Sequence, residues 1–299
     1  MTAITSSRPT RPPRPARRRT RRGSLPQRLA WHAMVIALIA VVVYPLLWLL
    51  GQSFKPADEI VTNLRFWPSH VTLDNYVQGW SGLPAGTFLR FFGNSLLVAS
   101  LAVVGNVLAC SLTGFALAKL RFRGRGVFFA IMIGTLLLPY HVLIVPQYVI
   151  FRQLGWIDTI LPLVVPKFLA TDAFFVFLMV QFIRGVPREL DDAAKLDGCG
   201  PWRLYWQITM PLARPALVTT SIFAFVWTWN DFFTQLVYLS SPEKYTVPLA
   251  LNLFIDHTSQ SAYGPMFAMA LVSMLPIFLF FLAFQRLLVE GIATSGLKG

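Results

Sequence analysis

The sequence predicts an all-α polytopic membrane protein, and three observations carry this prediction. Hydrophobic residues make up 55% of the 299 residues, and charged residues make up 13%, about half the share usual in soluble domains. The mean hydropathy is +0.58. The apolar residues also gather in runs long enough to cross a bilayer, which excludes a disordered chain and is typical of helical membrane proteins.

Each apolar run is a candidate transmembrane helix. The first run has 20 residues, about 30 Å as a helix, so we expect an uncleaved span rather than a signal peptide. The six expected spans are roughly 31–50, 93–117, 127–150, 160–183, 215–239 and 265–285. Internal prolines in the third, fourth and sixth runs leave two interpretations open, ordinary kinked packing or a bundle that bends around a cavity.

The second run carries small residues at helical spacing. They predict a helix face that allows neighbouring helices to approach closely. These residues are Gly105, Ala109, Gly114 and Ala118.

The net charge of +13 is concentrated near the N-terminus. Nine arginines lie between Arg8 and Arg28, directly before the first apolar run, among prolines that oppose a regular helix. This pattern favours a disordered cytoplasmic anchor facing anionic lipid over a nucleic-acid-binding segment. With the N-terminus inside, 20 of the 26 lysines and arginines fall in cytoplasmic segments. The sequence therefore predicts six spans with both termini in the cytoplasm (N-in/C-in).

The expected organisation has four parts. A polybasic cytoplasmic tail is followed by the first transmembrane helix with a partly ordered extracellular segment, then by a core transmembrane domain and a short cytoplasmic C-terminal tail. Their bounds are 1–29, 30–92, 93–289 and 290–299. The core contains a long polar loop at 184–214, placed in the cytoplasm.

The loop 184–214 carries its own helix signals. Carboxylates follow Pro187, where they favour the positive end of a helix dipole, and Gly198 is suited to end the helix. A second piece starts at Gly200–Pro201, and its aromatic residues are expected at the lipid headgroups: Trp202, Tyr205 and Trp206. Two interpretations remain, a helix gripped by another protein or an interfacial helix without a partner.

This loop resembles the signature loop of ABC importer permeases. That signature is Glu-Ala-Ala, three residues, Gly, nine residues and Ile-x-Leu-Pro. The chain has Asp192-Ala193-Ala194, Gly198 and Ile208-Thr209-Met210-Pro211 at the same spacing, with Asp in place of Glu and Met in place of Leu. Other stretches, such as "SFKPADEI", "FALAKLRFRGR" and "LIVPQYVIFRQLGWIDT", resemble carbohydrate-uptake permeases of the maltose type, in particular the second permease subunit.

The resemblance implies a type I ABC importer permease in the plasma membrane. It implies three kinds of partner: a second permease subunit, a dimer of ATPase subunits and an extracellular sugar-binding protein. The loop, which we call the coupling loop, would dock its helix in a cleft of the ATPase and link ATP hydrolysis to alternating access. The implied ATPase-coupling residues are Asp192, Ala193, Ala194, Leu196 and Gly198. Replacing Gly198 by a β-branched residue is expected to uncouple transport without preventing insertion.

The sequence predicts no catalytic, metal or cofactor site in this chain. It contains no Gly-x4-Gly-Lys-Ser/Thr phosphate loop, so ATP hydrolysis must come from another chain. Scattered histidines give no metal-ligand spacing, and no cofactor is expected. Cys110 and Cys199 are expected at different depths and unpaired.

A polar group in the fifth run is the candidate substrate path. Asn230 and Asp231 are costly in hydrocarbon and should face the bundle interior, water or a partner. Two interpretations remain open, a structural polar cap or a role in the sugar path or gate. Trp227 and Trp229 could stack on sugar rings or belong to the aromatic belt. Asp172 ranks below these residues; it could pair with Lys167, but a separation of five residues is a poor match on one helix.

Other functional classes fit the sequence less well. An ion-coupled secondary transporter predicts an intramembrane acid–base relay and repeat symmetry, and a membrane-embedded enzyme predicts a catalytic cluster at one depth. Neither pattern is visible. Within the importer class, a permease for a phosphorylated polyol or a peptide remains the alternative.

Overall fold

The computed structural model describes residues 25–63, 65–83, 86–255 and 262–296. These residues form helices joined by turns, and within the described ranges the only β-type pairing is an isolated bridge between Leu83 and Gly86. Two compact units are separated after Leu47. The first contains most of helix α1, and the second, from Trp48 onward, contains the remaining helices.

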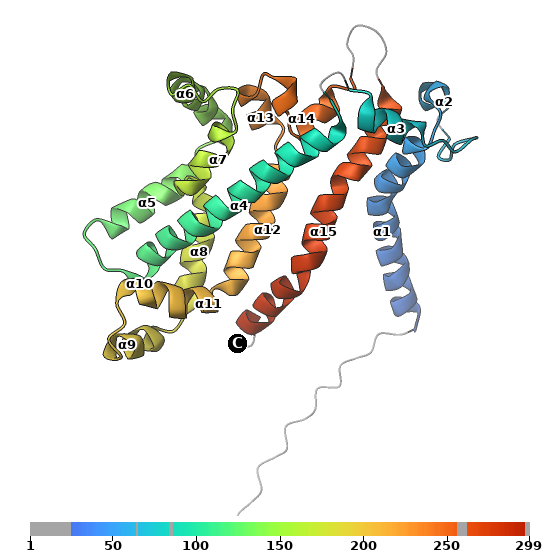
Figure 1. The fold of residues 1–299 in the computed structure, drawn as a ribbon. Coiled ribbons are helices and arrows are strands. Elements are labelled where there is room, and N and C mark those ends of the chain that lie inside the picture. The colour runs from blue at the N-terminus through green and yellow to red at the C-terminus, as the bar shows by residue number, and fades with distance from the viewer. Residues whose placement is uncertain (1–24, 64, 84–85, 256–261, 297–299) are drawn as a thin grey trace, which may run out of the picture. The chain divides into compact units, whose positions relative to one another are not determined.

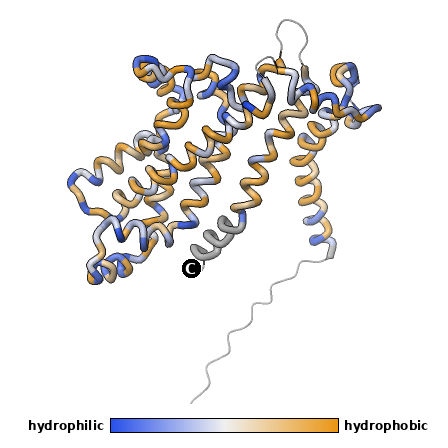
Figure 2. The backbone as a smooth tube through the Cα atoms, in the orientation of Figure 1, coloured by the Kyte–Doolittle hydropathy of each residue, from blue (hydrophilic) through white to orange (hydrophobic). Residues whose placement is uncertain are grey.

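Long apolar helices dominate the described chain. They are α1 (Leu25–Ser53), α4 (Phe88–Lys119) and α15 (Tyr263–Gly296). By length and composition four described helices could cross a membrane, or up to six if each of two bent helix pairs counts as one span. Figure 2 shows the apolar residues along the helices and the hydrophilic ones mostly in the connections of the second unit.

The helices of the structure extend into both segments that were expected to be tails, 1–29 and 290–299. Helix α1 begins at Leu25, before the end of the expected tail 1–29, because Pro26 lies in the first helical turn, where its missing N–H costs little. The remaining tail residues lie outside the described chain. At the other end, α15 continues to Gly296, since no proline follows Pro276 to stop the helix. The helical backbone therefore covers most of the segment 290–299.

Three expected spans are interrupted. The third run divides into α5 (Arg125–Leu136) and α6 (Tyr140–Gln153), bent by 105°. Pro139 lies at the break, where it lacks a donor and restricts the residue before it. The fourth run divides into α7 (Leu161–Phe168) and α8 (Ala173–Gly185), and the fifth run contains α12 (Arg214–Asn230) and α13 (Phe233–Tyr238).

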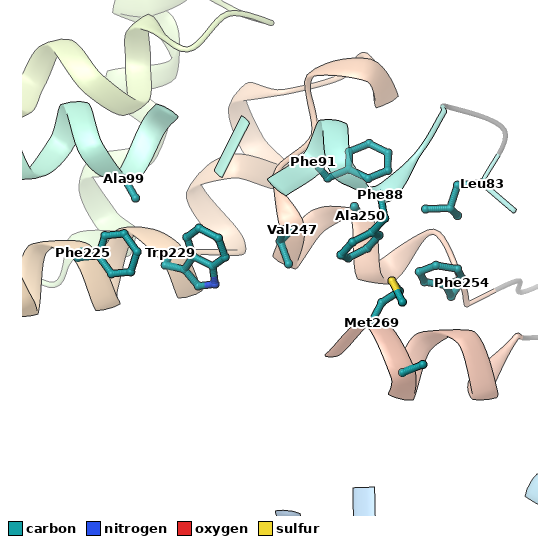
Figure 3. Packing of buried hydrophobic residues seen from close by; sticks show 11 residues of the cluster. Leu83, Phe88, Phe91, Ala99, Phe225, Trp229, Val247, Ala250, Phe254 and Met269 are labelled. Carbon is teal, nitrogen blue, oxygen red and sulfur yellow. The ribbon is translucent and has the colours of Figure 1, made fainter. Parts of the chain in front are cut away.

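Helix α4 is the central helix of the second unit and packs against α7, α8 and α12 (Figure 1). A methyl group at Gly105 would lie 2.8 Å from the Phe168 ring, and one at Gly114 would lie 2.6 Å from Cβ of Met179. These glycines therefore allow the close approach of α7 and α8 that the sequence predicted. The α12 and α15 side of α4 holds an apolar core that includes Phe88, Phe91, Phe225, Trp229 and Met269 (Figure 3).

The two ends of the second unit differ in their short elements (Figure 1). One end carries the coupling loop, with α9 (Arg188–Leu196), α10 (Pro201–Leu204), a π-helix η1 (Tyr205–Thr209) and α11 (Met210–Leu212). The opposite end carries α2 (Ala57–Thr62), α3 (Asp74–Ser81), α13, a 3₁₀ turn η2 (Pro242–Lys244) and α14 (Val247–Asn252).

A hydrogen-bonded clamp holds two loops together at the end opposite α9. Asp158, between α6 and α7, accepts bonds from the backbone N–H groups of Ser240 and Ser241 at 3.0 and 2.9 Å, and from the Ser241 hydroxyl at 2.6 Å. Lys244 Nζ lies 2.7 Å from Asp158 Oδ2. These donors hold the pKa of Asp158 well below its usual range, with the Lys244 bond contributing most.

Candidate functional site

Helix α9 begins and ends on local signals. Pro187 precedes its first residue, and Glu189 and Asp191 lie in the first turn. At the other end Gly198 has a φ of 77°, a conformation that favours glycine. The Gly198 N–H donates to the Lys195 carbonyl at 3.0 Å and the Cys199 N–H to the Ala194 carbonyl at 2.9 Å. This pair of bonds is a Schellman motif, so the turn after α9 is fixed by its own backbone.

One face of α9 is open to solvent. Leu196 is 90% exposed, an unusual position for a leucine, and Ala193 is also exposed. Asp192 lies on this face and pairs with Lys195 one turn away at 2.9 Å. The Lys195 ammonium lowers the pKa of the Asp192 carboxyl. The exposed face thus combines an apolar tip with an ion pair that stays within the helix.

The opposite face of α9 is buried through Asp191 and Ala194. Asp191 Oδ2 lies 2.6 Å from Nζ of Lys119, the last residue of α4, and both side chains are buried. Lys119 Nζ also donates to the Val186 carbonyl at 3.2 Å. This pair is not predictable from the sequence. The only local signal was that Asp191 and Ala194, three residues apart, share one helix face.

The second half of the coupling loop turns an aromatic residue inward. Tyr205 is 1% exposed, and its hydroxyl lies 2.8 Å from Ser111 Oγ on α4. The expectation that Tyr205 belongs at the headgroup level is therefore wrong, because the π-helix turns its ring onto Phe115 of α4. Trp202 and Trp206 remain exposed.

A cavity of about 1420 Å³ lies among the interrupted helices. Its wall includes residues from α4, from the α5–α6 break, from the α7–α8 break and from the end of α12. Of the two interpretations of the internal prolines, the structure favours the bundle that bends around a cavity. Polar residues of the wall include Thr113, His141, Gln147, Lys167, Asp172, Asn230, Asp231 and Thr234.

The candidate path residues of α12 divide between the cavity and the core. Asn230 and Asp231 line the cavity together with Trp227. Trp229 is 2% exposed, and its Nε1 donates to the Ser273 carbonyl of α15 at 3.1 Å. Figure 3 shows Trp229 beside Phe225 in the apolar core. Of the two tryptophans expected either to stack on a sugar ring or to lie in the aromatic belt, Trp227 therefore lines the cavity and Trp229 lies in the core.

Lys167 and Asp172 form an ion pair at the cavity wall. Nζ of Lys167 lies 3.1 and 2.9 Å from the two carboxylate oxygens of Asp172. The pair that the sequence left as a possibility forms because the two residues do not share a helix, so the poor five-residue match does not apply. Lys167 lies in α7 and Asp172 directly precedes α8, with Ala170 at a φ of 54° in the break between them.

Comparison with known proteins identifies the family. Residues 110–294 match the family model described as "Binding-protein-dependent transport system inner membrane component". The arabinooligosaccharides transport system permease protein of Halalkalibacterium halodurans is 33% identical over 91% of this chain and 97% of its own length. The galactooligosaccharides transport system permease protein of Bacillus subtilis is 27% identical over 91% of this chain and 96% of its own length.

A solved structure has the same fold. It is a chain in the crystal structure of a bacterial ABC transporter involved in the import of the acidic polysaccharide alginate. The TM-score is 0.77 at 22% sequence identity, and the match covers 88% of this chain and 98% of that chain. At this identity the likeness supports the fold and leaves the solute to other evidence.

Proposed function

The chain belongs to the family of binding-protein-dependent transport system inner membrane components, and we propose that it is the permease subunit of an ATP-driven importer of a sugar or oligosaccharide. Relatives along nearly its whole length are permeases of arabinooligosaccharide and galactooligosaccharide transport systems. A relative from Streptomyces coelicolor, 28% identical, is a diacetylchitobiose uptake system permease. These relatives favour a carbohydrate over the alternative solutes, a phosphorylated polyol or a peptide.

The proposed complex contains three further kinds of subunit in or at the plasma membrane. They are a second permease, a pair of ATPases and an extracellular binding protein. The chain has no phosphate-binding loop, so hydrolysis belongs to the ATPases. The excess of lysine and arginine in the segments around α9 supports a cytoplasmic position for the coupling loop, on the side where the ATPases would bind.

The exposed face of α9 is the proposed docking surface. The observation that carries this assignment is Leu196, a 90% exposed leucine on a helix whose opposite face is held against the bundle. In an ATPase cleft, Leu196 would bury its side chain, and Ala193 would allow close approach of the partner backbone. Asp192 presents a carboxylate beside them, and Gly198 fixes the direction of the chain that follows.

The cavity is the proposed half of the translocation path. Sugars combine apolar ring faces with hydroxyl groups, and the wall offers the Trp227 ring next to the polar ends of Asn230 and Asp231. The second permease would complete the path. Trp229 supports this wall from the core side through its bond to the Ser273 carbonyl.

Purification of the tagged chain from its native membranes in mild detergent tests the docking surface. We expect an ATPase, a second permease and a binding protein to co-purify. Leu196→Ser should lose the ATPase but keep the second permease. Val61→Ser, which changes a 73% exposed residue on α2 at the opposite end, is the matched control and should keep all partners. Retention of the ATPase by Leu196→Ser would remove the docking assignment.

The same complex in proteoliposomes tests coupling and the solute class. Gly198→Val should insert and assemble but lose ATP-driven uptake, because a β-branched residue is strained at this φ. The solute panel contains radiolabelled arabinooligosaccharides, galactooligosaccharides, diacetylchitobiose, glycerol 3-phosphate and a tripeptide. Uptake of one of the carbohydrates supports the proposal, whereas uptake of only glycerol 3-phosphate or the peptide contradicts it.

A further inference from the structure

The buried ion pair between α9 and α4 differs from the other ion pairs of the described residues. The side chains of Lys119 and Asp191 are 6% and 8% exposed. In each of the other three pairs both side chains are at least 22% exposed. The pair therefore lies between the docking helix and the central helix, with almost no access to water.

Such a pair is a poor means of stabilising a fold. Removing two charges from water costs free energy that their attraction repays only when every remaining lone pair is bonded. Here Asp191 Oδ1 is buried and has no hydrogen-bond partner among the described residues. What the pair does provide is a directional contact, because it holds the first turn of α9 and the end of α8, through the Val186 carbonyl, at one point on α4.

A second polar contact joins the same two elements. Ser111 and Lys119 are eight residues apart, about 12 Å along α4, and lie on one helix face. Ser111 Oγ meets the Tyr205 hydroxyl at 2.8 Å, and Phe115 lies between the two contacts against the Tyr205 ring. The coupling loop thus holds α4 at two points, one on α9 and one on its π-helix.

The neighbouring face of α4 lines the cavity. Leu112, Thr113 and Ala116 are cavity residues, and two of them, Leu112 and Ala116, are next in sequence to Ser111 and Phe115, which contact the coupling loop. A displacement of the end of α4 would therefore reach the cavity wall through one continuous helix.

We propose that Lys119 and Asp191 form the joint through which a displacement of α9 moves α4 and so changes access to the cavity. This inference rests on the proposed docking of α9 on an ATPase. It makes Lys119 and Asp191 positioning residues, distinct from Asp192, whose ion pair with Lys195 stays within α9. Adjacent carboxylates of the loop then have separate roles: one faces the partner, and the other faces the bundle.

The test follows the cavity wall directly and needs no knowledge of the sugar. Thr113→Cys is introduced into the chain after Cys110→Ala and Cys199→Ser, and the native complex is reacted with a thiol reagent. With Lys119 and Asp191 intact, the labelling rate should change at least about fivefold between the nucleotide-free and the ATP–vanadate-trapped complex. The joint variant is Lys119→Met/Asp191→Leu, which removes both charges while keeping similar side-chain volumes.

We expect the joint variant to co-purify with the ATPase and to hydrolyse ATP, with its labelling rate unchanged by trapping. Lys119→Arg, which keeps the ion pair, should retain the change in labelling rate on trapping. The proposal would be overturned if trapping changed the labelling rate in the joint variant by a factor within about twofold of the factor seen with Lys119 and Asp191 intact. If this variant does not assemble, Lys119→Gln/Asp191→Asn decides by the same criterion. If the Thr113→Cys complex with an intact joint shows no change on trapping, the proposed alternating access fails instead.

Discussion

Two lysine–aspartate pairs, one at each end of the second unit, hold loops in opposite ways. At the α9 end, Lys119 and Asp191 are buried, and one carboxylate oxygen of Asp191 has no partner among the described residues. At the opposite end, Lys244 is 47% exposed and Asp158 22% exposed, yet Asp158 also accepts bonds from Ser240 and Ser241.

The difference separates burial from hydrogen-bond satisfaction. A charge that loses its partner in a buried site has no water to replace it, so each member of the Lys119–Asp191 pair depends on the other. Asp158 accepts hydrogen bonds from several donors, and its side chain is partly exposed to solvent, so removal of one donor leaves the others in place. The buried pair is suited to transmit a displacement, whereas the clamp at Asp158 is suited to tolerate one.

Loss of one buried charge should have the largest effect on stability. Lys119→Met leaves Asp191 buried without a counter-ion, and we expect a loss of about 3–5 kcal/mol in the free energy of unfolding. Thermal unfolding of the purified chain in detergent measures this loss. Lys119→Met/Asp191→Leu should recover most of it, because neither charge remains. A single variant as stable as the unmodified chain would show that water reaches Asp191.

Removal of the acceptor of the clamp should come second. Asp158→Ala deprives Ser240, Ser241 and Lys244 of their acceptor and places alanine at a φ of 59°, so we expect a loss of about 2–3 kcal/mol. Asp158→Asn should cost about half as much, because asparagine tolerates this φ and still accepts hydrogen bonds. Equal losses in the two variants would mean that charge, rather than acceptor geometry, holds the clamp.

The pH dependence of stability separates the contribution of the Asp158 charge from that of its acceptor geometry. The pKa of Asp158 is lowered in the folded state from its ordinary value of 3.8, so its stabilising contribution is present above that value and is lost as the pH falls below it. Between about pH 5 and about pH 3, the melting temperature of the purified chain should therefore fall more steeply than that of Asp158→Asn. Parallel curves for the two chains would contradict the assignment.

Sequence reasoning located the coupling loop because its signals are local. Pro187 and Gly198 mark the ends of α9 from within the segment itself. It could not find the partner of Asp191, which lies 72 residues away on α4. Such a pairing depends on which face of α9 meets the bundle, and only the tertiary packing fixes that.

The cavity was harder to predict for a related reason. Asn230 and Asp231 stand out as polar residues in an apolar run, but the run does not show which of Trp227 and Trp229 lies beside them. The rotation of α12 places Trp229 in the core and Trp227 at the cavity. The Lys167–Asp172 pair is only a possibility from the sequence, because five residues match poorly on a continuous helix; the break at Ala170 brings the two side chains together.

The smallest effect should come from the exposed member of the clamp. Lys244→Met removes one donor from Asp158, and because the lysine is 47% exposed we expect a loss of only about 0.2–1 kcal/mol. The ion pair is screened by salt, so the difference in melting temperature between Lys244→Met and the unmodified chain should shrink as salt is raised from about 0.05 to about 0.5 M. The Lys119→Met difference should stay nearly constant over this range, because salt does not enter a buried pair. If both differences shrink alike, the Lys119–Asp191 pair is open to solvent, and the contrast between the two ends of the molecule disappears.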